Sequence, residues 1–327
     1  MTTPEQPPLY LDVVDIGNRS DKTRHPFVRL LRQRYDVRLV DRPELLLVGH
    51  AGHKHRLYSC AKLFFTDEGD LPDFRHYDFA ITQRVFEDPR HCRHPSYARW
   101  LDDPARLIKA PEETEVVLAA KDRFCAFFTG YANAKVQHRI DFFNTLTRRK
   151  SVDSCGKAMN TIGGPVPFAL GAKLDFLRRY KFTIAFENKQ LPGYITEKII
   201  EPMAARSVPI YWGDPRVVEE FNPASFINAN DFESYEALAD YIIEVDRDDA
   251  RYRQYLEAPF FAGNRLNRFF EPDYLLEFFE EVIAQARQRA KGLCAKRPLV
   301  GRWRLAKADH PRRPEDDAMD MTMRDGT

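Results

Sequence analysis

The sequence has few of the features that mark disulfide-rich or strongly charged proteins. Its five cysteines are odd in number, scattered, and include no Cys-x-x-Cys spacing. This pattern argues against a disulfide framework and against a zinc site, and it favours a reducing compartment. The net charge is only +1 over 327 residues, which argues against a protein whose whole surface binds nucleic acid.

An apolar start and a dinucleotide fingerprint are also absent. Residues 1–8 have neither a basic beginning nor an apolar run, so no signal peptide or membrane anchor is expected and a cytoplasmic location is predicted. No Gly-x-Gly-x-x-Gly follows the first expected strand. Because that motif is what binds the cofactor pyrophosphate, its absence argues against a dehydrogenase.

The sequence does contain enough apolar residues for two folded domains. Hydrophobic residues make up 43% of the chain, with 24 phenylalanines and 14 tyrosines, and the length allows each domain a core of its own. Short apolar runs in the first half predict an α/β domain with parallel strands. The expected strands are 10–16, 37–40, 45–48, 63–65 and 79–81. A new strand begins at Cys125, so the domain change is placed near residue 122.

Residues 182–214 predict a strand, a loop, a helix and a second strand. The loop contains Pro192 and Gly193, and Thr196 is a good N-cap for the helix that follows. A helix N-terminus favours an anion, and Lys198 in the first turn adds a positive charge there, while Glu197 offers an acceptor for sugar hydroxyls. The simpler alternative is an ordinary solvated Glu-Lys pair.

The spelling of this stretch resembles a known signature. Phe186-Glu187-Asn188, then Tyr194-Ile195-Thr196-Glu197-Lys198, then Val208-Pro209-Ile210 and Gly213 are similar to the donor-binding residues of the α1,3/4-fucosyltransferases, glycosyltransferase family 10. The resemblance implies an α/β fold of the GT-B type, with two Rossmann-like domains facing each other across a cleft. It implies inverting transfer of fucose from GDP-fucose to an acceptor sugar. The donor-binding residues it implies here are Glu187, Asn188, Tyr194, Glu197 and Lys198.

The same resemblance assigns roles to the parts of the chain. It implies an acceptor-binding domain over 1–122, a GDP-fucose-binding domain over 123–271 and a helix over 272–295 that crosses back to the first domain. The Lys and Arg content of the chain itself indicates a basic, flexible tail over 296–327. Arg139, followed by Phe142, Phe143 and Leu146, matches the family residue that contacts the GDP pyrophosphate, and a guanidinium suits a diphosphate. The alternative is that Arg139 pairs only with Asp141 or Asp122.

A turn-rich acidic loop after the strand at 63–65 offers a general base. Asp67, Glu68, Asp70 and Asp73 all qualify by chemistry, because a positioned carboxylate can take the proton of an attacking hydroxyl. The resemblance selects Glu68, since Pro72, Phe74 and the strand at 77–81 follow it at the family spacing. The chain departs from the usual bacterial pattern at the two neighbours of Glu68. A solvated acidic loop is the alternative.

Neither a metal nor another cofactor is expected. Asp246-Arg247-Asp248 spells Asp-x-Asp but ends an amphipathic helix, and Arg139 with Lys198 makes a divalent cation unnecessary for neutralising GDP. His50, His53 and His55 lie together without a cysteine or carboxylate, so we interpret them as solvated or acceptor-facing.

The expected partners are GDP-fucose and a β-galactoside-containing oligosaccharide or glycolipid. The resemblance suggests the GlcNAc of N-acetyllactosamine or the glucose of lactose, as in Lewis antigens, lipopolysaccharide or protein glycans, and leaves α1,3 and α1,4 linkage open. The basic stretch 287–313 contains Trp303 and is either a solvated extension or a peripheral contact with the inner face of an anionic membrane. Two other functions stay open: a transferase for another nucleotide sugar, and a sugar-binding module without catalysis.

Overall fold

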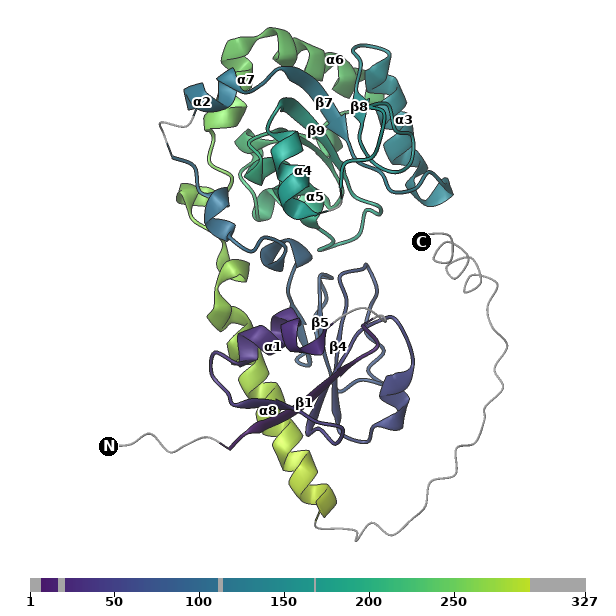
Figure 1. Ribbon diagram of the computed structural model, residues 1–327, viewed down its shortest axis with the longest axis vertical. Coiled ribbons are helices and arrows are strands. Elements are labelled where there is room, and N and C mark those ends of the chain that lie inside the picture. The colour runs from purple at the N-terminus through teal and green to yellow at the C-terminus, as the bar shows by residue number, and fades with distance from the viewer. Residues whose placement is uncertain (1–6, 17–20, 111–113, 168, 295–327) are drawn as a thin grey trace. The chain divides into compact units, whose positions relative to one another are not determined.

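The computed structural model describes residues 7–16, 21–110, 114–167 and 169–294 (Figure 1). These residues form two sheets, one from residues 9–93 and one from residues 123–228, and every pairing between their strands is parallel. The expected α/β fold with two parallel-sheet lobes is therefore confirmed. The basic tail at 296–327 lies outside the described residues. In the described part of the chain no helix has the length and apolar character needed to cross a bilayer.

The first sheet has six strands in the order β2-β1-β3-β4-β5-β6. Their bounds are β1 Leu9–Val14, β2 Val37–Leu39, β3 Leu45–Val48, β4 Ala61–Phe65, β5 Phe79–Thr82 and β6 His91–Arg93. All four residues of β3 are buried, as expected for a parallel strand covered on both faces. In the register, Leu47 lies between Val13 of β1 and Leu63 of β4.

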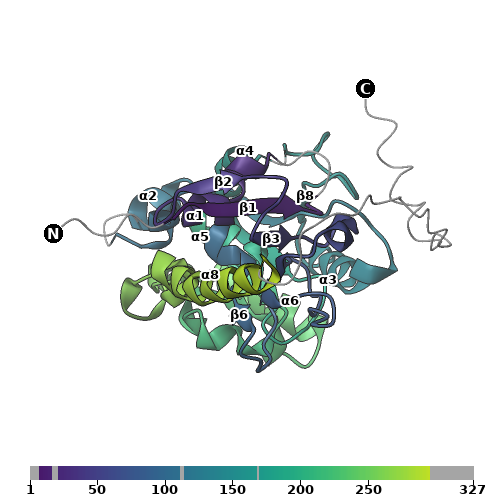
Figure 2. The ribbon, with the colours of Figure 1, turned by 90° about the horizontal axis from the view of Figure 1, so that it is seen from below.

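Two helices cover one face of the first sheet. They are α1, Pro26–Leu31, and the long α8, Pro272–Cys294, which is seen along its length beside β1 and β3 in Figure 2. Leu275, Phe279 and Val282 of α8 belong to the same apolar core as Leu47, and Phe279 packs edge-on against Phe27 of α1 with ring centres 5.7 Å apart. The helix α8, which follows the second sheet in the sequence, thus completes the core around the first sheet.

The second sheet has five strands in the order β11-β10-β9-β7-β8. Their bounds are β7 Arg123–Phe127, β8 Asp153–Ser154, β9 Tyr180–Phe186, β10 Val208–Trp212 and β11 Ile227–Asn228. The helices of this lobe are α2 Thr114–Ala119, α3 Gln137–Thr147, α4 Leu170–Leu177, α5 Glu197–Ala204, α6 Tyr235–Arg247 and α7 Asp249–Glu257. The residues of α3, α6 and α7 share one core cluster, and those of α5 share another.

The strand order of the second sheet reverses beside β7. The chain runs from β7 outward to β8, then returns to form β9 on the opposite side of β7. In open parallel sheets, ligands bind at the carboxyl ends of the strands where the order reverses. The ends of β7 and β9 are therefore the place where the second lobe is expected to bind a ligand.

Short elements follow β10. The chain forms a 3-10 helix, Pro215–Glu219, before the two-residue strand β11, Ile227–Asn228. Asn222 caps a further turn, Pro223–Ser225, which precedes that strand.

Candidate functional site

Arg139 lies where the strand order of the second sheet reverses. It sits in the first turn of α3, is 6% exposed, and donates from Nη1 to Oδ1 of Asn188 at 3.0 Å and from Nη2 to the carbonyl oxygen of Phe128 at 2.6 Å. Phe128 follows β7 and Asn188 follows β9. The guanidinium therefore joins the carboxyl ends of the two strands. Its buried Nε has no hydrogen-bond partner within the described part of the chain.

The local pairing considered for Arg139 does not occur. Asp141 accepts a hydrogen bond from Gln137 at 2.8 Å, and Asp122 pairs with Arg179. Burial lowers the pKa of Arg139, while the charge of Glu187 opposes that shift. The interpretation of Arg139 as a partner of Asp141 or Asp122 is thus wrong, and its charge is directed toward the strand ends.

Glu187 ties the end of β9 to the start of α5. Its side chain has no exposed surface, and Oε1 accepts a 2.7 Å hydrogen bond from the backbone N–H of Thr196. The Thr196 hydroxyl donates to Oε2 of Glu187 at 2.8 Å, and Thr196 is the N-cap of α5. The carboxylate therefore fixes the first turn of the helix, and we interpret Glu187 as a positioning residue beneath the surface of the site.

Lys198 is held by two carboxylates. Its Nζ lies 3.0 Å from Oε1 of Glu197 and 3.4 Å from Oε2 of Glu187. Burial opposes the charged form of Lys198, but Glu187 and Glu197 together outweigh it and raise the pKa of the ammonium group. Burial likewise raises the pKa of Glu187, whereas Lys198 outweighs burial at Glu197 and lowers the pKa of that carboxyl. An incoming anion would share Lys198 with these carboxylates.

The two predicted cations, Arg139 and Lys198, both contact residues that follow β9. Arg139 bonds Asn188, and Lys198 pairs with Glu187, the preceding residue of the chain. The charge of Arg139 also acts on the pKa of Lys198. Asn188 further donates to the hydroxyl of Tyr131 at 3.4 Å, and Tyr131 is half exposed. Sequence reasoning missed Tyr131, although an aromatic residue just after β7 marks the same sheet edge.

Glu68 lies on the loop that follows β4. Its backbone N–H donates to the hydroxyl of Thr66 at 3.0 Å, and its side chain is exposed, with no hydrogen bond or ion pair to another described residue. The next residue, Gly69, packs against Leu191 and Tyr194: a methyl group on it would lie 2.6 Å from Cδ1 of Leu191 and 3.8 Å from Cδ2 of Tyr194. Burial raises the pKa of Tyr194, and the charge of Glu68 adds to the shift. The loop of the candidate base therefore touches the loop before α5.

The other carboxylates of this loop are engaged differently. Asp67 pairs with Arg99. Asp73 accepts hydrogen bonds from the side chain and the backbone N–H of Arg75, the shortest at 2.7 Å from Nη2. These bonds hold the pKa of Asp73 well below the usual range, although both side chains reach the surface. Asp70 is exposed. Of the four carboxylates that could act as the general base by chemistry alone, Asp67 and Asp73 are thus already paired with arginines.

His55 and the Asp-x-Asp sequence have structural roles. His55 is buried and its Nδ1 lies 2.7 Å from Oδ2 of Asp15, so the interpretation of His55 as solvated or acceptor-facing is wrong. Asp246 pairs with Lys150 at 2.6 Å and Lys181 at 3.0 Å. Asp248 caps α7. Over the described residues no group of three or more histidines, cysteines, aspartates or glutamates could hold a metal ion.

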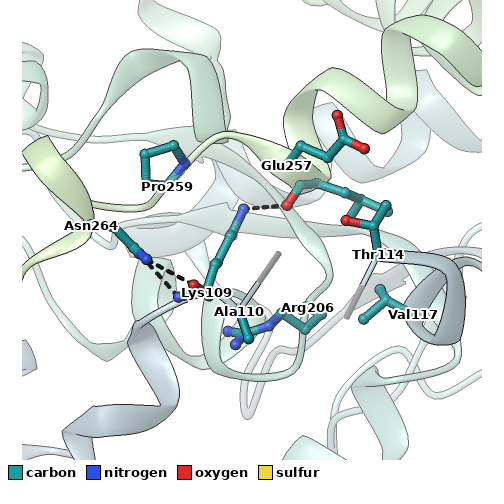
Figure 3. Close-up of a pocket in the computed structure, with 9 residues that line it drawn as sticks. Lys109, Ala110, Thr114, Val117, Arg206, Glu257, Pro259 and Asn264 are labelled. Atoms are coloured by element: carbon teal, nitrogen blue, oxygen red, sulfur yellow. Dashed lines mark hydrogen bonds between the residues drawn. The ribbon is translucent and has the colours of Figure 1, made fainter. Parts of the chain in front are cut away.

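A separate cavity of about 440 Å³ lies between α2 and the end of α7 (Figure 3). Its lining residues are Lys109, Ala110, Thr114, Val117, Arg206, Leu256, Glu257, Pro259 and Asn264. Nζ of Lys109 donates to the carbonyl oxygens of Tyr255 and Leu256, and Arg206 donates to those of Arg106 and Ile108. Because the side chains of Lys109 and Arg206 bind main-chain carbonyls, we interpret them as structural contacts that hold together the segments around the cavity.

Two family models match the chain. One is described as glycosyltransferase family 10 (fucosyltransferase) C-term and matches residues 118–258, and the other is the alpha-(1,3)-fucosyltransferase FucT N-terminal domain and matches residues 11–100. Together they include the positions of Glu68, Arg139 and Lys198.

Individual relatives agree with these matches. Over 252 residues the chain is 30% identical to the alpha-(1,3)-fucosyltransferase FucT of Helicobacter pylori, covering 65% of the chain and 51% of that relative. Over 148 residues it is 36% identical to the 3-galactosyl-N-acetylglucosaminide 4-alpha-L-fucosyltransferase of Bos taurus, covering 44% of the chain and 39% of that relative. The chain therefore spans about half, or less, of the length of these curated relatives.

A solved structure is similar over most of the chain. It is that of an alpha1,3-fucosyltransferase with GDP-fucose, at a TM-score of 0.70 and 26% identity, and the match covers 86% of this chain and 92% of the other. A structure of an alpha1,3-fucosyltransferase with GDP matches with a TM-score of 0.71.

Proposed function

Because the chain belongs to glycosyltransferase family 10, we propose that it transfers L-fucose from GDP-fucose to a hydroxyl of an acceptor oligosaccharide. The observation that carries this proposal is the position of Arg139. Its guanidinium joins the carboxyl ends of β7 and β9 where the strand order reverses, next to the helix start that carries Lys198. This is the arrangement that a nucleotide diphosphate needs.

Donor binding follows from the charges at this strand end. Arg139 and Lys198 bind the diphosphate oxygens, and the first turn of α5 adds its N–H groups. Asn188, Tyr194 and Glu197 hold the ribose and the fucose, while Glu187 keeps Thr196 and Lys198 in place. With two cations and a helix N-terminus at the leaving diphosphate, the proposed reaction needs neither a divalent metal nor another cofactor.

The transfer step uses Glu68 as general base. The carboxylate takes the proton of the acceptor hydroxyl as its oxygen forms a bond to the anomeric carbon of fucose. The bond between that carbon and the diphosphate oxygen breaks, and its electron pair leaves with GDP. Attack from the face opposite GDP inverts the anomeric configuration. Glu68 suits this role because its carboxylate is exposed and the next residue, Gly69, packs against Tyr194. A positioned base contributes about 10²–10⁴-fold.

The acceptor is proposed to be a β-galactoside, with transfer to the GlcNAc of N-acetyllactosamine or the glucose of lactose. Alpha1,3 linkage is proposed because the relative from H. pylori is an alpha-(1,3)-fucosyltransferase. Since the bovine relative is a 4-alpha-L-fucosyltransferase, α1,4 linkage is the alternative. Lewis-type glycans on lipopolysaccharide or protein would supply such acceptors.

The deciding experiment is incubation of the full chain with GDP-fucose and lactose, N-acetyllactosamine or its β1,3 isomer. Mass spectrometry and linkage analysis of the product are expected to show one added fucose in α1,3 linkage. Parallel reactions with other nucleotide sugars test donor choice. A product formed only from another donor, or GDP-fucose binding with neither transfer nor hydrolysis, would overturn the proposal.

Replacing the base tests the mechanism. Glu68→Gln is expected to lower kcat by roughly 10²-fold or more, because the amide cannot take the proton. GDP affinity measured by calorimetry should stay unchanged, since Glu68 contacts neither Arg139 nor Lys198 in the described part of the chain. The matched control is Asp70→Asn, an exposed carboxylate of the same loop. Full activity of Glu68→Gln would remove Glu68 from the mechanism.

A further inference from the structure

Two loops from different halves of the chain meet at the candidate site. We define the base loop as residues 66–70, which includes Glu68, and the donor loop as residues 189–194, which leads into Thr196 and α5. Gly69 of the base loop packs against Leu191 and Tyr194 of the donor loop. The separation of these loops therefore determines how far the Glu68 carboxylate lies from a donor bound at the start of α5.

Arg84 binds the backbone of both loops. It follows β5, and its Nη1 donates to the carbonyl oxygen of Gly69 at 2.9 Å while its Nε donates to the carbonyl oxygen of Pro192 at 3.3 Å. The backbone N–H of Val85 donates to the same Pro192 oxygen at 3.1 Å. The side chain of Gln83 donates to the carbonyl oxygen of Asp67 in the base loop. One short segment after β5 thus holds both loops.

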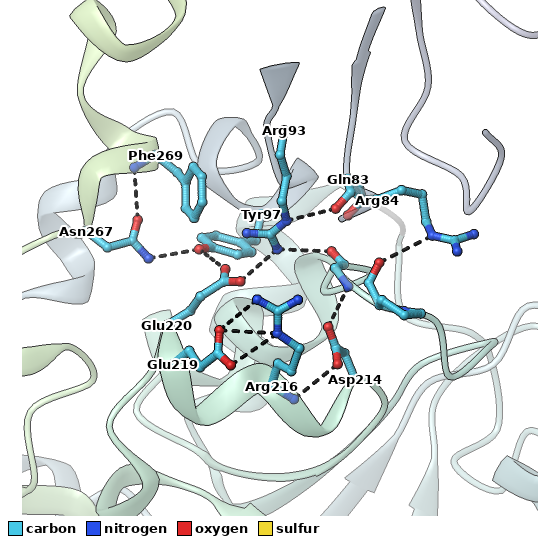
Figure 4. Close-up of polar contacts among 12 residues, drawn as sticks. Gln83, Arg84, Arg93, Tyr97, Asp214, Arg216, Glu219, Glu220, Asn267 and Phe269 are labelled. Carbon is cyan, nitrogen blue, oxygen red and sulfur yellow. Dashed lines mark hydrogen bonds and ion pairs between the residues drawn. The ribbon is translucent and has the colours of Figure 1, made fainter. Parts of the chain in front are cut away.

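Arg93 holds the donor loop from a second side (Figure 4). Its Nη2 donates to the carbonyl oxygen of Gly193 at 3.1 Å and its Nε to that of Gln83 at 2.9 Å. The same guanidinium pairs with Glu220 at 2.7 Å, and Glu220 also accepts a 2.6 Å hydrogen bond from Tyr97. The backbone N–H of Gly193 donates to Asp214. Both the backbone N–H and the carbonyl oxygen of Gly193 are therefore hydrogen-bonded.

We propose that Arg84 is a positioning residue that holds the base loop against the donor loop, while Arg93 also fixes the donor loop. The inference rests on the proposed function for its consequence in catalysis. A general base must lie within hydrogen-bond reach of the proton it removes. A displacement of about 1 Å can cost about 10²-fold in rate, so a residue that sets this spacing acts on kcat without touching the substrate.

Arg84→Ala is the test variant. We expect kcat for fucose transfer to fall about tenfold or more. The calorimetric Kd for GDP should change much less than kcat, because Arg84 is not bonded to Arg139 or Lys198. Arg84→Lys should give an intermediate kcat, since an ammonium is a point charge that does not span two carbonyls as the guanidinium does. The matched control is Arg216→Ala, which removes a surface ion pair with Glu219 (Figure 4).

Hydrogen exchange separates this inference from the proposed function. In Arg84→Ala, amides of both 66–70 and 189–194 should exchange faster than in the wild type, while the strands keep their protection. Unchanged exchange in both loops, wild-type kcat, or a loss of GDP affinity that parallels the loss of kcat would each overturn the positioning role. If the wild type shows no fucose transfer, the proposed function fails and the exchange data still decide whether Arg84 joins the loops. Should Arg84→Ala not fold, Arg84→Gln is measured in its place against the same criteria.

Discussion

Glu187 is a carboxylate without exposed surface whose charge is compensated by Lys198, 3.4 Å away, and by hydrogen bonds from Thr196. Removing one partner of a buried pair leaves an uncompensated charge, which typically costs about 3–5 kcal/mol. We expect Lys198→Met to lower the free energy of unfolding by about this amount at neutral pH and to weaken GDP binding. Urea unfolding and calorimetry measure the two effects, with the exposed Lys157→Met as control. If Lys198→Met were as stable as the wild type, the result would contradict a stabilising ion pair between Lys198 and Glu187.

The loss of unfolding free energy in Lys198→Met should depend on pH. Burial raises the pKa of Glu187 in the folded protein above that of the unfolded chain. Its contribution to stability is therefore full below the unfolded pKa and is lost as pH rises through the folded pKa. Without Lys198 the folded pKa rises further. The difference in unfolding free energy between wild type and Lys198→Met should thus be larger at pH 8 than at pH 5.

Most of the candidate donor site could be predicted because its residues stand together in the sequence. Asn188, Tyr194, Glu197 and Lys198 surround one strand-loop-helix turn, and the turn itself was indicated by Thr196. The sequence could not show that Lys198 is already paired with Glu187. That contact depends on full burial of the strand end, which only the packed lobe determines.

Gly193 gives the donor loop its shape. Its φ is +84°, and a methyl group there would overlap the carbonyl oxygen of Gln83. We expect Gly193→Ala to cost about 1–3 kcal/mol in stability, because the new side chain is both strained and overlapped, and to reduce kcat by displacing Tyr194. Urea unfolding and transfer assays measure the change. Gly171→Ala, at an open position in α4, should not be destabilised. Equal stability of both variants would contradict this account of the loop.

The buried strands were easier to predict than the strands at the sheet edges. β3 and β4 are apolar runs with neighbours on both sides, and their parallel pairing follows from that pattern. β6 and β8 were not predicted: they are short, contain His91 and Asp153, and pair on one side only.

The contact between Arg84 and Pro192 could not be predicted from the sequence. It joins segments that are 108 residues apart, and no local sequence pattern indicates such a contact.

The chain as a whole is nearly neutral, but its charge is not evenly distributed. Over 296–313 the basic residues are Lys296, Arg297, Arg302, Arg304, Lys307, Arg312 and Arg313. Trp303 lies among them, and acidic residues follow from Glu315 onward. A basic cluster with an aromatic residue is attracted to anionic lipid by about 1 kcal/mol per cation near the surface. A lipid-linked acceptor would be presented at such a surface.

We therefore expect the full chain to bind anionic vesicles at low salt and to lose this binding when Arg302, Arg304 and Lys307 are replaced by glutamine. Raising the salt concentration should have the same effect, because screening weakens attraction between exposed charges. Co-sedimentation with anionic and neutral vesicles measures binding, and Asp316→Asn with Asp317→Asn serves as the matched control. Transfer to free oligosaccharide should be unaffected in all variants, since the cluster lies outside both matched family regions. Equal vesicle binding by the glutamine variant would favour a solvated extension instead.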